Sequence, residues 1–82
     1  MNIGDIIIVP GNNYLVTDIP NETETDVLSL AHPEMGVMRL MLISADFPIR
    51  PATESELNYA VGYLNGFCQR IEKQCMNLQK LI

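Results

Sequence analysis

The sequence of 82 residues has no tryptophan, a single histidine and only two cysteines. Its five lysines and arginines face ten acidic residues, so the formal net charge is −5 at pH 7. An acidic chain repels the phosphate backbone that dominates nucleic-acid affinity, and we therefore expect no direct binding to DNA or RNA. No stretch approaches the ~20 apolar residues of a membrane span, and the first residues lack the features of a signal peptide. A single cytoplasmic domain with no membrane partner is expected.

Catalytic and metal-binding patterns are missing as well. The chain has no glycine-rich nucleotide loop, no GxSxG nucleophile motif and no HExxH zinc motif. His32, Cys68 and Cys75 are the residues that could bind a metal or form a nucleophile pair. In a helix, the seven-residue spacing of the cysteines holds their Cα atoms ~10 Å apart, too far for a disulfide or one zinc ion. We therefore predict free thiols, no metal, no cofactor and no enzymatic activity, with His32 in a turn.

Short β-branched runs separated by turn formers predict a β body over residues 1–52. Strands are expected at residues 6–9, 14–17, 27–30 and 37–43. The last of these runs is apolar on both faces, which is typical of a central strand. Residues 47–51 contain two prolines and favour a short strand at the edge of the sheet.

One long amphipathic helix is expected over residues 53–82. Thr53 and Glu56 match a capping box, which predicts that the helix begins at Glu54. Apolar residues then recur every seven positions, at Leu57, Leu64, Ile71 and Leu78. No proline interrupts this stripe, so the helix should continue to about Lys80.

Such a helix would be ~40 Å long, whereas a compact chain of this size is only ~30 Å across. It should overhang the β body, and a second copy of the chain is the simplest cover for its apolar stripe. We therefore predict a homodimer whose contacts are Leu64, Phe67, Ile71, Cys75, Leu78 and Leu81. The alternative is a helix that bends or breaks at Gly62 or Gly66 and folds back over the sheet.

Four acidic residues lie close together around one predicted loop. They are Asp18, Glu22, Glu24 and Asp26. Their spacing does not match an EF-hand, so the choice is between a solvated loop and a surface for a basic partner. We predict these four residues as partner contacts. Met35, Met38 and Met41 could form an adaptable binding surface, but core filling is the favoured interpretation.

Two segments carry a resemblance to a known family. Gly4-Asp5 leads the first β-branched run, and Tyr14-Leu15-Val16 forms the second. This pattern resembles the opening of a small SH3-like or KOW-type barrel, and residues 49–53 resemble the exit from such barrels in bacteriophage proteins. The resemblance covers residues 3–53 and implies a protein-binding, nucleic-acid-binding or structural module.

The predicted fold is therefore α+β: a small SH3-like antiparallel barrel or curved meander, followed by one long C-terminal amphipathic helix. The predicted function is a non-enzymatic interaction protein, of the kind that phages use to modulate a host defence complex or the transcription machinery. Two alternatives stay open, namely an acidic mimic of nucleic acid that blocks a DNA- or RNA-binding site, and a small structural subunit.

Overall fold

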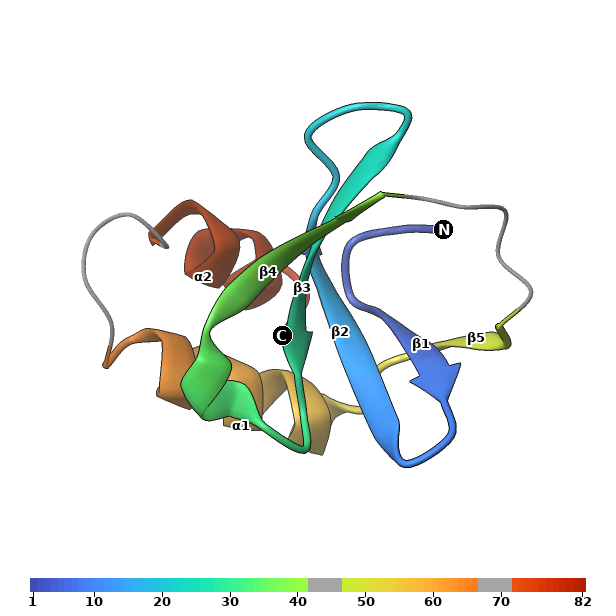
Figure 1. Ribbon diagram of the computed structural model, residues 1–82. Helices are drawn as coiled ribbons and strands as arrows, with labels where there is room; N and C mark the ends of the chain where they lie inside the picture. The colour runs from blue at the N-terminus through green and yellow to red at the C-terminus, as the bar shows by residue number, and fades with distance from the viewer. Residues whose placement is uncertain (42–46, 67–71) are drawn as a thin grey trace.

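The computed structural model describes residues 1–41, 47–66 and 72–82. In these residues five strands, with one short 3-10 helix among them, come before two α-helices (Figure 1). The strands are β1 (Asp5–Val9), β2 (Asn12–Asp18), β3 (Glu24–Ser29), β4 (Val37–Met41) and β5 (Ile49–Pro51). The helices are α1 (Glu54–Leu64), α2 (Glu72–Gln79) and the short 3-10 helix η1 (Pro33–Met35).

The strands form one five-stranded antiparallel sheet in the order β4-β3-β2-β1-β5. Gly11 closes the tight β1–β2 turn with a φ of +78°, a conformation that glycine adopts without strain. Between β2 and β3 the register shifts: Val16 pairs with Val27, but Asp18 pairs with Asp26. Thr17 is thus the extra residue of a β-bulge, and the bulge brings Asp18 to the same face of the sheet as Asp26.

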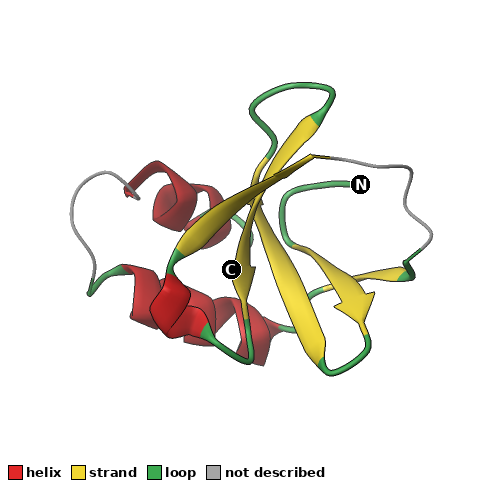
Figure 2. Ribbon diagram, viewed as in Figure 1, coloured by secondary structure: helices red, strands yellow, loops and turns green. Residues whose placement is uncertain are grey.

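Both helices pack on one face of the sheet, and the core lies between these two layers (Figure 2). The core residues are Ile6, Leu15 and Leu28 from the sheet, Leu57, Ala60 and Leu64 from α1, and Cys75 and Leu78 from α2. Val16 and Val27 alternate with Leu15 and Leu28 along their strands and are also fully buried. Strands β2 and β3 are therefore buried on both faces, which is typical of central strands.

The prediction that residues 37–43 form the central strand is wrong for the part of that run that the structure describes. Strand β4 is an edge of the sheet, and Leu40 and Met41 are exposed there. The strand is apolar on both faces because hydrophobic side chains of this edge, Leu40 and Met41, are left exposed, and not because both faces are buried. The edge position predicted for residues 47–51 is confirmed, because β5 pairs only with β1 among the described strands.

The start of the helix is confirmed in detail. The Glu56 N–H donates to Thr53 Oγ1 (3.2 Å), and the Thr53 N–H donates to Glu56 Oε1 (2.9 Å), which completes the capping box. Arg50 of β5 donates to both carboxylate oxygens of Glu56 at 2.8 Å. This ion pair, with the cap, lowers the pKa of Glu56 to about 2. The short connection between β5 and α1, residues 52–53, is thus held by contacts with both elements.

The predicted SH3-like barrel or curved meander followed by one long C-terminal helix is wrong, although an α+β fold is compatible with the structure. The sheet is open, with β4 and β5 as its two edges in the described part of the chain. Helix α1 has 11 residues and ends at Leu64, and α2 has 8 residues. The molecule measures 32 × 24 × 23 Å, and neither α1 nor α2, the α-helices of the described ranges, is long enough to overhang the body. Folding back lets one chain bury its own apolar stripe, which was the alternative to dimerisation.

The six residues predicted as homodimer contacts lie in different environments. Leu64, Cys75 and Leu78 lie in the core of their own chain, whereas Leu81 is about half exposed. Phe67 and Ile71 lie outside the described residues. Homodimerisation stays a prediction, but the overhanging helix that motivated it is absent.

Candidate functional site

The four acidic residues predicted as partner contacts lie at one end of the sheet, around the β2–β3 loop at the top of Figure 1. Their exposure divides them into two pairs. Asp18 and Asp26 are paired across β2 and β3 and are buried. Glu22 lies exposed in the loop, and Glu24, at the start of β3, is partly exposed. The two pairs therefore have different roles.

The Asp26 carboxylate is held by side chains from two other elements, and its backbone carbonyl by a side chain from a third. The Arg39 Nε of β4 donates to Asp26 Oδ1 (2.9 Å), and the Gln74 Nε2 of α2 donates to Oδ2 (3.2 Å). The Thr17 hydroxyl of the bulge donates to the Asp26 carbonyl oxygen (3.1 Å). Because Asp26 is only 3% exposed, the donors from Arg39 and Gln74 replace the water that its buried carboxylate loses.

Asp18 binds the same helix through residues on either side of Gln74 in the sequence. Lys73 Nζ lies 3.2 Å from Asp18 Oδ2, and the Asn77 Nδ2 donates to Oδ1 (3.3 Å). Asn77 also donates to the carbonyl oxygen of Thr17 (3.0 Å). The two buried acids thus fasten α2 to the sheet. Gln74, a polar residue at a heptad position where Ala60, Phe67 and Leu81 are apolar, makes one of these contacts.

The loop itself is ordered by one asparagine. The Asn21 Oδ1 accepts from the backbone N–H groups of Thr23 and Glu24, both at 2.9 Å. The Asn21 Nδ2 donates in turn to the Glu24 carboxylate (3.1 Å). Glu24 also lies 3.7 Å from Arg39, so Glu22 is the more accessible of the two remaining acids.

Most cations of the described residues are already paired with acids of this chain. Three of the four described lysines and arginines, namely Arg39, Arg50 and Lys73, form ion pairs. Several acids, by contrast, lie exposed at the surface, among them Glu22, Glu54 and Glu72. The net negative charge is therefore concentrated on the outside of the molecule.

Exposed apolar side chains gather along β4 and the turn before it. Met35 of η1 is 64% exposed, and Leu40 and Met41 of β4 are 38% and 74% exposed. Core filling is therefore the wrong interpretation for Met35 and Met41. Flexible, polarizable methionine side chains on a surface are typical of adaptable binding sites.

The remaining chemical groups are spread over the molecule. His32 is exposed with its Nδ1 3.3 Å from Glu34 Oε1, whereas Cys75 is buried, with its thiol 3.0 Å from Asn65 Oδ1. Burial raises the pKa of the Cys75 thiol, which reduces its reactivity. Among the described residues no three metal-binding side chains gather, and Cys68 lies outside them.

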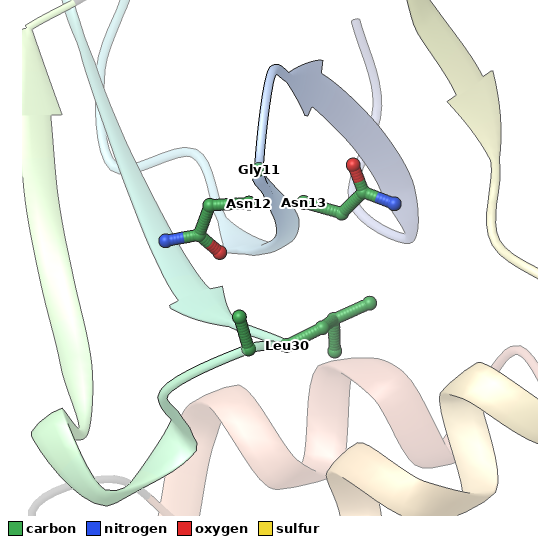
Figure 3. A pocket seen from close by; sticks show the side chains of 5 residues that line it. Gly11, Asn12, Asn13 and Leu30 are labelled. Carbon is green, nitrogen blue, oxygen red and sulfur yellow. The ribbon is translucent and has the colours of Figure 1, made fainter.

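A shallow hollow opens beside the β1–β2 turn (Figure 3). It is lined by Gly11, Asn12, Asn13, Leu30 and Ala31. The Asn12 side chain is already engaged, because its Oδ1 accepts from the Ser29 hydroxyl (2.8 Å) and its Nδ2 donates to the Tyr14 hydroxyl (3.2 Å). The lining therefore offers no acid, base or nucleophile for catalysis.

No protein-family model matches the chain, and neither a curated protein nor a solved structure matches it significantly. The resemblance to SH3-like and KOW-type barrels stays a prediction, as does a bacteriophage origin. Neither α1 nor α2, the α-helices of the described ranges, is long and apolar enough to cross a bilayer.

Proposed function

We propose that this chain is a non-enzymatic interaction module that binds a basic surface of another protein through two acids at its β2–β3 loop, the exposed Glu22 and the partly exposed Glu24. The observation that carries this proposal is the internal pairing of the cations. Arg39, Arg50 and Lys73 neutralise acids of the body, which leaves a mainly acidic outer surface, with Lys80 as the one described lysine or arginine outside these ion pairs. Such a surface speeds association with a partner of opposite charge and selects against acidic partners.

The partner is a protein, and the setting is the cytoplasm, where an unpaired thiol such as Cys75 is stable. The host factors named above, a defence complex or the transcription machinery, fit this description. Mimicry of nucleic acid has less support, because Asp18 and Asp26 are buried against Lys73 and Arg39 and are lost from any dense acidic face.

The burial of Asp18 and Asp26 also decides how the proposal is tested. Reversing their charge would release α2 from the sheet, so a loss of binding in such variants would report unfolding. The informative variant is Glu22→Lys with Glu24→Lys, which changes the loop. The matched control is Glu54→Lys with Glu72→Lys, which makes the same change of charge at two exposed helix positions.

The measurement is affinity capture with the tagged full chain from lysate of its source cells, at low and at high salt. We expect a partner that the wild type and the helix control retain at low salt, that high salt releases, and that the loop variant loses. If the wild type, the loop variant and the helix control capture the same proteins at both salt concentrations, the acidic loop is not a binding surface.

A further inference from the structure

One edge of the sheet is open to another strand. Strand β4 pairs with β3 and with no other strand among the described residues. It lies at the front of the view in Figure 1, with β3 behind it. In an antiparallel sheet, alternate residues of an edge strand direct their N–H and C=O groups outward, so β4 presents a row of backbone groups that a further strand could pair with.

The opposite edge is protected against such pairing. Strand β5 has three residues, ends at Pro51 and follows Pro48. Proline lacks the N–H that a ladder needs, and short proline-containing edges are a usual protection against added strands. Strand β4 has five residues without proline, and its one charged residue, Arg39, is engaged by Asp26. The two edges therefore differ in the feature that decides strand addition.

The side chains of β4 would gain from being covered. Leu40 and Met41 point to opposite faces of the sheet, because successive residues of a strand alternate. Both are exposed, and Met41 is 74% exposed. A strand added beside β4 would bury part of Leu40 on one face and part of Met41 on the other, at a gain of ~25 cal/mol for each Å² of apolar surface.

Acidic residues lie at both ends of this edge. Glu24 is the cross-strand neighbour of Met41, and Glu22 precedes it in the loop. At the other end, Glu34 lies in η1, directly before β4 begins. An added strand with a basic residue at each end would place both of its charges near carboxylates.

We propose that β4 binds an extended segment of another protein by strand addition. The segment is about five residues long, the length of β4, has apolar residues on both faces to cover Leu40 and Met41, and carries lysine or arginine at both ends. This inference rests on the proposed function and specifies how the basic partner is held.

The test uses the intact chain and a displayed peptide library. Each peptide has a randomised centre of five residues, matching β4, between two lysines. A second library has glutamates in place of the lysines. We expect binders from the lysine library alone, with β-branched and aromatic residues enriched on both faces of the central five positions. The strongest binder is then made as a soluble peptide and its affinity measured by calorimetry.

Two variants locate the binding surface. Met41→Lys adds a charge to the edge strand, and we expect it to weaken peptide binding about tenfold, since lysine on an edge opposes pairing and repels the basic ends. Met76→Lys makes the same change at an exposed methionine of α2 and should leave the affinity within about twofold. Hydrogen exchange should slow at alternate amides of β4 in the complex.

Equal effects of the two variants, exchange protection confined to other elements, or a lack of binders from the lysine library would overturn strand addition. If the protein instead self-associates in ultracentrifugation and Met41→Lys makes it monomeric, the occupant of β4 is a second copy and the proposed segment is rejected. In the capture experiment, a partner lost by the loop variant but kept by Met41→Lys would reject strand addition alone. A partner kept by both variants would reject the proposed function as well.

Discussion

Replacing Asp26 with asparagine should show how much the buried acid contributes to holding α2 on the sheet. The substitution keeps the size of the side chain but removes its charge. Hydrogen bonds to a buried charged group each contribute ~1.5–3 kcal/mol. The Arg39 side chain is 56% exposed, so solvent screens its ion pair with Asp26. That ion pair therefore contributes at most ~1 kcal/mol. The bond from Gln74 is enclosed and is only partly kept by an asparagine oxygen.

We therefore expect Asp26→Asn to lower the free energy of unfolding by about 2 kcal/mol. That is a large fraction of the ~4–12 kcal/mol expected for a domain of this size. The melting temperature should fall by about 10 °C. Urea unfolding followed by circular dichroism measures the change.

The matched control is Glu22→Gln, which removes the same charge from an exposed position in the neighbouring loop. It should change stability by less than ~0.5 kcal/mol. A double-mutant cycle between Asp26→Asn and Gln74→Ala should give a coupling energy above ~0.5 kcal/mol. If Asp26→Asn is as stable as the control, or the cycle shows no coupling, then Asp26 does not fasten α2.

Three further predictions concern α1 and the strand before it. Thr53→Ala should cost about 1 kcal/mol of stability in urea unfolding because it removes the cap, whereas Ser55→Ala, at an exposed position of the same turn, should cost less than about 0.5 kcal/mol. Gly62→Ala should stabilise the protein by about 0.5–1 kcal/mol in the same assay, because a Cβ there meets no atom within 4 Å; a loss of stability would show that the glycine is needed. The pKa of Glu56 is lowered by Arg50 from 4.5 to about 2, so the stabilising effect of this carboxylate is complete above pH 4.5 and is lost as the pH falls toward 2. Thermal unfolding should therefore show Glu56→Gln less stable than the wild type near neutral pH and the difference shrinking over that acid range, and a difference independent of pH would contradict the ion pair.

Local chemistry in the sequence determined the parts of the fold that depend on neighbouring residues. The capping box of Thr53 and Glu56 involves positions three apart, so it can be read directly from the chain, and α1 begins where it predicts. The prolines at positions 48 and 51 place β5 at an edge for an equally local reason. The acidic loop was also found, because its residues are close in sequence.

The tertiary structure alone decided which acids are buried. The bulge at Thr17 changes the face to which Asp18 belongs, and alternation along a strand does not reveal such an insertion. Gln74 carried a signal, since a polar residue within an apolar stripe indicates a polar partner, but that partner, Asp26, lies 48 residues away in the sequence.

Contacts between residues distant in sequence also decided where the helix ends and which strand lies at the edge of the sheet. A heptad stripe fits a long helix that dimerises equally well as two helices that fold back, because both bury the same apolar side chains. The choice depends on how α2 packs against Asp18 and Asp26, which are distant in sequence. Likewise, a run that is apolar on both faces fits a central strand or an exposed edge, and only the order of the strands in the sheet decides that β4 is an edge.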